Sequence, residues 1–481
     1  MTNNTESKKI PEGFEGLISA LEATKRPFYC AGSLPLDENK PIAILVRDAP
    51  SDLPSKFTPV SFPLKNKSDI MPLINASNQA SFGKGGEAVI DPSYRRALVL
   101  HKKDFGICPA GSLDPHDLGI LNSISRMLLP SFSLPAKKMS DEDEEMSSAS
   151  DEDEYDAPDE DEDAGGARII ARLDKLNVYS EGDFFKGHVD TARSSDMFGT
   201  LLINLPVRHE GGQLVVKAPM VKSSDTDLKQ DEYTTKWGSG TDLEWIAFFS
   251  DCEHEVLPVT SGNRVTLTFT LSFDNTNNGA EPFGAEIVAK SRYPKIELLH
   301  RALTAPGIFT QDHPRLCFYL EHRYPIDGMS ERADSVKHKL KGRDAILYHL
   351  LVQAGVTVTF HHVLFPDDPK YCGISEHDDD QVCAILPQSV DRLEGYDGEE
   401  ENGLDEIVIT QGGRSPRQLD IIEVTGDPKF FVKVDYAVQG NEPASVHAAY
   451  GTVCMVATMQ GCDVDEPWRK QKPKKNPYRY Y

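Results

Sequence analysis

The chain has 481 residues, a length typical of two or three domains. Apolar and aromatic residues make up 39% of it, which is enough for sizeable cores and excludes a chain that is disordered throughout. The net charge is −25, but 15 acidic residues without one Lys or Arg lie between Asp141 and Asp163, and outside this segment the net charge is only −10. The rest of the chain is therefore mildly acidic, which disfavours nucleic acid as a partner.

The sequence also indicates a compartment. The longest apolar runs, such as Pro41 to Val46, are far too short to cross a bilayer. Residues 1–9 carry charges without a following apolar stretch, so no secretory signal is expected. Eight cysteines without a C-x-x-C pair argue against a zinc ribbon or a disulfide framework and suit a reducing compartment. We expect an intracellular protein of the cytoplasm, the nucleus or both, without a membrane partner.

Residues 1–135 have a mixed pattern and are expected to pack on a central core. Asp114-Pro115 predicts a helix start, with Asp as N-cap and Pro at the first helical position. The apolar residues that follow fall near one helix face: Leu118, Leu121, Ile124 and Leu128. Residues 136–166 hold the acidic segment, which repels itself and has little to bury, so we predict a disordered linker there. A basic protein is the partner that such a segment would recruit.

Residues 167–275 carry short strand patterns separated by Gly, Pro and Asp turns, and no long helical period interrupts them. Apolar and polar residues alternate strictly from Arg264 to Phe273, as on a strand with one polar face. The pattern predicts a mainly β (α+β) fold and favours an antiparallel sandwich or jelly roll over an alternating β–α fold. Other strands are expected at 201–205, 213–216 and 244–249.

Residues 288–465 are expected to form a second domain, α+β or β-rich, whose role no motif indicates. A helical pattern covers 334–355 and ends at a glycine, and 356–360 alternates like a strand. Further strands are expected at 406–409, 430–438 and 447–459. Residues 466–481 form a basic tail, for which three interpretations stay open: a nuclear-localisation patch, an electrostatic contact for an acidic partner, and a plain solubilising end.

The first motif that carries chemistry runs from Tyr179 through Gly182 and Phe185 to His188-x-Asp190. Residues two apart on a strand project to the same face, so His188 and Asp190 can reach one point. An imidazole and a carboxylate so placed are two of the three ligands of a facial iron triad. Taken alone the pair is a weak signal, because single His and Asp residues of strands usually lie on the surface.

The second motif places His254 ten residues before Arg264, across a turn at Ser261-Gly262. The alternation from Arg264 onward directs Arg264 and Thr266 to the same polar face. A guanidinium inside a sandwich is costly unless an anion meets it. His254 can supply the third metal ligand, so the two motifs together predict a metal site beside an anion site.

These motifs resemble the catalytic domain of Fe(II)- and 2-oxoglutarate-dependent dioxygenases, in the prolyl-4-hydroxylase-like branch. The similar stretch covers about residues 170 to 273, and the whole chain resembles long fungal forms of this branch. The resemblance implies a double-stranded β-helix (jelly roll) core with flanking helices. It also implies an oxidoreductase that uses Fe(II), with 2-oxoglutarate and O2 as cosubstrates and ascorbate as a supporting cofactor. The implied iron ligands are His188, Asp190 and His254, and the implied neighbours of 2-oxoglutarate are Arg264, Thr266, Tyr179 and Asn204.

One departure from the branch is Asn204, which stands where these enzymes often have a Tyr that helps to hold the distal carboxylate of 2-oxoglutarate. The resemblance then leaves that carboxylate to Arg264, Thr266 and Tyr179. It implies hydroxylation of a C–H bond, of a prolyl or other residue of a protein or of a small molecule, with release of succinate and CO2.

A second hypothesis is a binding or scaffold protein with a relic jelly roll, whose acidic segment recruits basic partners. The intact set of His188, Asp190, His254 and Arg264 argues against it, since drift would be expected to alter these positions first. A second metal site is not expected at His361-His362, because adjacent strand residues point to opposite faces. Nor is one expected at 377–380, whose acidic run lacks the spacing of a calcium loop. Cys252 is expected to be a small buried apolar residue.

Overall fold

A computed structural model describes residues 13–24, 27–36, 41–47, 57–84, 87–129, 132–133, 169–218, 232–235, 242–274, 286–287, 294–326, 332–364, 383–388, 412–425, 439–440 and 449–469 of the chain. The acidic segment, the strands expected at 406–409 and 430–438, and nearly all of the basic tail lie outside these ranges.

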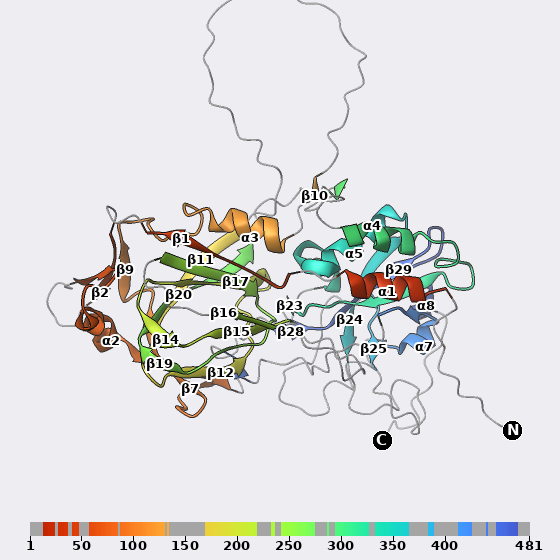
Figure 1. Ribbon diagram of the computed structural model, residues 1–481. Helices are drawn as coiled ribbons and strands as arrows, with labels where there is room; N and C mark the ends of the chain where they lie inside the picture. The colour runs from red at the N-terminus through yellow and green to blue at the C-terminus, as the bar shows by residue number, and fades with distance from the viewer. Residues whose placement is uncertain are drawn as a thin grey trace, which may run out of the picture.

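Two antiparallel sheets form the first core, and Figure 1 shows the larger one above the smaller. The larger sheet has the order β1 (Tyr29–Pro35), β17 (Asp242–Phe249), β13 (Met197–Asn204), β20 (Arg264–Phe273), β11 (Ile169–Tyr179), β8 (Leu98–His101) and β4 (Asn78–Gln79). The smaller sheet has the order β16 (Glu232–Thr235), β15 (Leu214–Lys217), β18 (His254–Val256), β12 (Phe184–His188) and β7 (Arg95–Arg96). The mainly β fold is as predicted.

Shorter elements surround these sheets. They are η1 (Lys67–Ile70), α2 (Met71–Ala76) and the strands β2 (Ile42–Arg47), β3 (Phe57–Phe62), β5 (Phe82–Lys84), β6 (Glu87–Val89), β9 (Phe105–Cys108), β10 (Phe132–Ser133), β14 (His209–Gly211), β19 (Val259–Gly262), β21 (Glu286–Ile287) and β27 (Gln439–Gly440).

Strand β20 has the bounds that the alternation predicts. The apolar residues of β20 are buried, and so are its polar residues Thr266 and Thr268, because the polar face points toward the smaller sheet. The apolar face belongs to the core that the helix α3 (Ile120–Leu128) covers (Figure 1). The helix expected from Asp114 begins only at Ile120: Gly119, in the left-handed region with a φ of 69°, interrupts the helical path.

The C-terminal half has a sheet of its own, with the order β25 (Ala384–Ile385), β24 (Thr357–Leu364), β29 (Val453–Thr458), β22 (Arg315–Tyr319) and β26 (Ile422–Glu423). Around it lie α4 (Pro294–Leu303), η2 (Ala333–Lys339), α5 (Gly342–Gln353), α7 (Pro416–Leu419), α8 (Glu466–Arg469) and the pair β23 (Tyr324–Ile326) and β28 (Ala449–Gly451). The helical pattern of 334–355 is divided into η2 and α5, because Leu340 and Lys341 between them have ψ angles of 137° and 151°, outside the helical region.

We expected residues 1–135 to pack on the first core, but one helix of this region packs elsewhere. Helix α1 (Glu15–Ala23) buries Leu17 and Leu21 against Ile296 and Leu299 of α4, in the apolar core of the C-terminal half (Figure 1). The amphipathic pattern of α1 shows which face is buried but not which distant surface covers it. Among the described residues, the structure contains no helix with the length and apolar content that a membrane span requires.

Candidate metal centre

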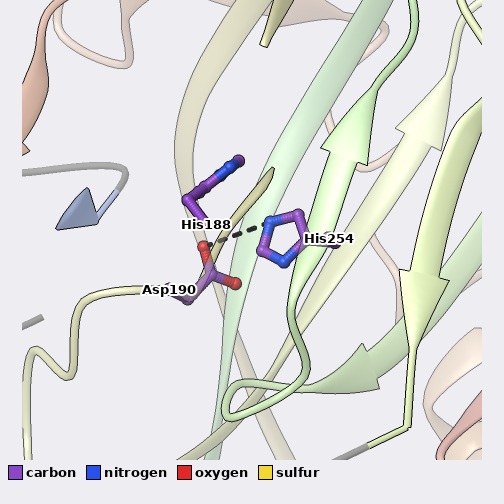
Figure 2. A group of neighbouring side chains, drawn as sticks. All are labelled: His188, Asp190 and His254. Carbon is purple, nitrogen blue, oxygen red and sulfur yellow. Dashed lines mark ion pairs between the residues drawn. The ribbon is translucent and has the colours of Figure 1, made fainter. Parts of the chain in front are cut away.

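The three side chains that the sequence predicts as ligands of one metal ion lie close together between the two sheets. His188 ends β12, Asp190 follows it, and His254 begins β18, which pairs with β12 so that His188 lies opposite His254. One ligand atom of each lies within 4.8 Å of the others, and all three residues are buried. The two imidazole centroids are 4.2 Å apart, and His254 Nε2 lies 3.7 Å from Asp190 Oδ1 (Figure 2).

Hydrogen bonds from the outer atoms of these side chains fix their orientation. Nδ1 of His188 lies 2.8 Å from the carbonyl oxygen of Lys186, and Nδ1 of His254 lies 3.1 Å from that of Cys252. A carbonyl only accepts, so both Nδ1 atoms carry the proton and both Nε2 lone pairs remain for a metal.

The carboxylate is held in a similar way from the larger sheet. The hydroxyl of Thr200, on β13, donates to Oδ2 of Asp190. Oδ1 is the oxygen on the side of His254. A hydrogen bond from a neighbouring side chain to a ligand carboxylate sets which oxygen faces the metal, so Thr200 supports the site without touching the metal position.

The electrostatics favour the ligand form of the histidine. Burial lowers the pKa of His188 well below its ordinary value, and the neighbouring His254 lowers it further. The imidazole is therefore neutral, as metal binding requires. Aromatic rings close the space around the cluster: Phe185 stacks on His188 at 3.6 Å between centroids, and Phe248 packs on His254 at 4.7 Å. The cluster offers two buried imidazole groups and one buried carboxylate to a single metal ion.

Arg264 lies farther along the same inner face, at the start of β20. It is 1% exposed, and its guanidinium lies 5.3 Å from the centroid of the Tyr179 ring. Burial lowers its pKa to about 10, a fall that the charges of Tyr179 and Glu244 partly offset. Arg264 is therefore still a cation at neutral pH, in a place where desolvation strengthens its attraction for an anion.

The residues expected beside Arg264 lie on this inner face. Thr266 is 1% exposed and pairs across the strands with Asn204 on one side and Asn177 on the other. Asn204 donates from Nδ2 to Glu244 at 3.2 Å. Glu244 was missed in the sequence, where a single Glu within an apolar strand was the available signal.

A glycine gives the arginine its room. Gly212 has a φ of 64°, and a Cβ added there would lie 3.2 Å from Cδ of Arg264 and 2.9 Å from Val259. The buried cation fits a carboxylate ligand, and the ligand set of two histidines and one carboxylate fits Fe(II) with open positions.

Residues 175–271 match the family model described as the 2OG-Fe(II) oxygenase superfamily. This part of the chain is a 2OG-Fe(II) oxygenase domain. Its cofactors are Fe(II), 2-oxoglutarate and O2, as predicted, and the domain is that of an oxidoreductase. The search of curated proteins found no match.

Several solved structures are similar to parts of the chain at low identity. An oxidoreductase of the 2OG-Fe(II) oxygenase family from Burkholderia pseudomallei is 21% identical over 22% of this chain and 45% of that one, so less than half of its length is spanned, with a TM-score of 0.17. A prolyl-4-hydroxylase from Pseudomonas putida is 14% identical over 54% of this chain and all of its own length, with a TM-score of 0.25. A Trichoplax adhaerens prolyl hydroxylase, solved with a hypoxia inducible factor peptide, is 13% identical over 56% and 94% of the two chains, with a TM-score of 0.23.

The convergence of His188, Asp190 and His254 agrees with the prediction from strand periodicity, which sets the residues that share a face. Thr200 was missed as a partner of Asp190, although a lone hydroxyl in the apolar stretch of β13 was an available signal. His361 and His362 lie on β24 of the other sheet. Among the described residues, the cluster of His188, Asp190 and His254 is the only group of three such side chains close enough to share a metal ion. Cys252 is buried, as expected.

Proposed function

We propose that the chain is an Fe(II)- and 2-oxoglutarate-dependent dioxygenase of the prolyl-4-hydroxylase-like branch, which hydroxylates a C–H bond of a protein side chain, with proline as the first candidate. The observation that carries the proposal is the convergence of His188, Asp190 and His254 beside a buried arginine. These three residues would bind the metal, and Arg264, with Thr266, Tyr179 and Asn204 nearby, would bind the distal carboxylate of 2-oxoglutarate.

The residues of the chain have separate roles in such a reaction. Bound Fe(II) supplies the redox chemistry that couples decarboxylation of 2-oxoglutarate to oxidation of a substrate C–H bond. Arg264 would hold the distal carboxylate of the cosubstrate by a charge-assisted contact in a desolvated place. Thr200 keeps Asp190 turned toward His254, and the rings of Phe185 and Phe248 exclude water.

A cavity of about 250 Å³ at the end of this inner face suits the substrate. It is lined by Lys102, Arg172, Leu173, Asp174, Arg193, Ser194, Met197, Thr270 and Ser272. Thr270 lies opposite Thr200, the partner of Asp190, and residues opposite each other on neighbouring strands share a face. The cavity therefore includes a residue on the strand face that carries Thr200, although none of its lining residues is a proposed metal ligand.

The charge of this cavity suggests what enters it. Both oxygens of Asp174 accept from Arg193, at 2.5 and 2.8 Å, so these two charges are matched. Lys102 and Arg172 also line the cavity, and no acidic side chain among the described residues pairs with either. An acidic flank beside the target residue would meet these two cations, so we propose a substrate with Asp or Glu near the hydroxylated position.

We also propose that residues 167–275 form a double-stranded β-helix and that most of 288–465 forms a second domain. The separate apolar cores of the two halves support this division. A location in cytoplasm or nucleus, and a basic partner for the acidic segment, are proposals from the sequence.

The test is succinate release that depends on Fe(II) and 2-oxoglutarate, with His188→Ala as the control. Proline peptides flanked by Glu are expected to raise the rate more than the same peptides flanked by Lys. Equal succinate release by wild type and His188→Ala would remove the enzyme proposal and favour a scaffold with a relic jelly roll.

A further inference from the structure

A buried ionic cluster joins the oxygenase domain to the C-terminal half. Asp251 lies in the turn between β17 and β18, and its side chain is 0% exposed. Its carboxylate accepts from Nζ of Lys341 at 2.8 Å, from the backbone N–H of Arg323 at 3.0 Å and from Nδ1 of His322 at 3.1 Å. All three donors belong to the C-terminal half. We call Asp251, His322, Arg323 and Lys341 the Asp251 cluster.

The donors are themselves held in place. Nζ of Lys341 also donates to the carbonyl of Arg323 at 3.0 Å, and its backbone N–H donates to the hydroxyl of Tyr324 at 2.9 Å. That hydroxyl donates to Asp344, which also accepts from the backbone N–H of His322. The cations thus sit in a preformed frame, and a preformed frame holds its partner with little loss of entropy.

The charge on Asp251 depends on this frame. Burial alone would raise the pKa of its carboxyl, but the charges of Lys341 and His322 outweigh burial and lower the pKa well below its ordinary value. A carboxylate in this position without its cation would be a strongly unfavourable buried charge. The turn that carries Asp251 is therefore fixed by the C-terminal half.

The same turn carries the contacts of His254. Asp251 is followed by Cys252, whose carbonyl accepts from Nδ1 of His254 and so sets the orientation of its imidazole. Phe248 and Phe249, the last two residues of β17, also contact both parts of the structure, because neighbouring residues on a strand face opposite sides. The ring of Phe248 packs on His254 at 4.7 Å, and the ring of Phe249 packs edge-on to His322 at 4.6 Å.

We infer that the C-terminal half positions the metal ligand His254 through the Asp251 cluster, which makes Asp251, His322 and Lys341 positioning residues of the oxygenase site. The inference rests on the proposed role of His254 as a metal ligand. It gives the C-terminal half, in which no catalytic motif is present, a physical role, because this half holds the turn whose backbone orients one imidazole.

The test uses the full chain and Mn(II), an air-stable stand-in for Fe(II), with free Mn(II) measured by electron paramagnetic resonance. Wild type is expected to bind one Mn(II) and His188→Ala to bind none at this site. Lys341→Met is expected to raise the Kd for Mn(II) by about 10- to 100-fold, the usual cost of losing a group that supports a metal ligand. His322→Leu, which leaves the Lys341 to Asp251 pair intact, is expected to give a smaller rise in the same direction.

The matched control is Arg315→Met. Arg315 is also a buried cation of the C-terminal half and donates to Glu466 at 2.8 Å, but it lies outside the Asp251 cluster. This variant should lose stability and keep the wild-type Kd at temperatures below its unfolding transition. If Lys341→Met fails to fold, His322→Leu carries the test.

The outcomes separate the two claims. A wild type that does not bind Mn(II) overturns the proposed metal site and this inference together. A wild type that binds, with Lys341→Met or His322→Leu binding equally well, overturns this inference alone. An equal loss of affinity in Arg315→Met would assign the effect to general destabilisation and would also overturn it.

Discussion

The substitution Arg264→Met separates a functional arginine from a structural one. Burial lowers the pKa of Arg264 well below its ordinary value, to about 10, so the folded protein holds this charge at a cost. A difference of this size corresponds to about 3 kcal/mol, at about 1.4 kcal/mol for each pKa unit. Methionine replaces the aliphatic stem of the arginine side chain and carries no charge. The free energy of unfolding of the variant without ligands is therefore expected to stay the same or to rise by up to about 3 kcal/mol.

The same variant is expected to lose 2-oxoglutarate. A hydrogen bond between a charged donor and a charged acceptor contributes about 1.5–3 kcal/mol, so loss of a two-bond contact should raise the KM for 2-oxoglutarate by at least about 100-fold. Urea unfolding measures the first effect, and succinate release at varied 2-oxoglutarate measures the second. Arg315→Met, at a buried arginine paired with Glu466, provides the structural comparison and should be destabilised. A loss of stability in Arg264→Met as large as in Arg315→Met, with an unchanged KM, would refute the reasoning.

Three further predictions follow from single contacts. Thr200→Val removes the hydroxyl that donates to Asp190 and should raise the Kd for Mn(II) by about 10-fold, whereas an unchanged Kd would deny Thr200 this role. Gly212→Ala places a Cβ 3.2 Å from Cδ of Arg264 at a φ of 64°, so the KM for 2-oxoglutarate should rise; a normal KM would contradict the close packing. Burial lowers the pKa of His361 from 6.5 to about 4, so below pH 6.5 the unfolded chain binds a proton that the folded chain does not. The free energy of unfolding of the wild type should fall by up to about 3 kcal/mol as the pH falls from 6.5 to 4. In His361→Phe, the free energy of unfolding measured with urea should depend less on pH over this range.

The strands and the site were predictable because they depend on a short-range rule. Alternation along β20 predicted its bounds and placed Arg264 and Thr266 on one face. The two-residue spacing of His188 and Asp190 placed these two side chains on one face at the end of β12. Helix boundaries were less predictable where a glycine has a positive φ. The apolar pattern predicts a helix from Asp114, but α3 begins only after Gly119.

Long-range packing could not be predicted in this way. The amphipathic pattern of α1 was compatible with any apolar surface, and the structure places it on α4. Asp251 and Lys341 are 90 residues apart, and neither stands in a motif, so only the fold shows that they meet. The sequence around Asp251 gives no sign that its side chain is completely buried.

The central claim is that His188, Asp190 and His254 bind one Fe(II) beside a site for 2-oxoglutarate. The most direct measurement is an anaerobic titration of the protein with Fe(II) in the presence of 2-oxoglutarate, which follows the weak visible charge-transfer band of the chelate. We predict a band in the wild type that saturates at one Fe(II) per chain and is lost in His188→Ala. A wild type without the band, or the same band in His188→Ala, would contradict the account.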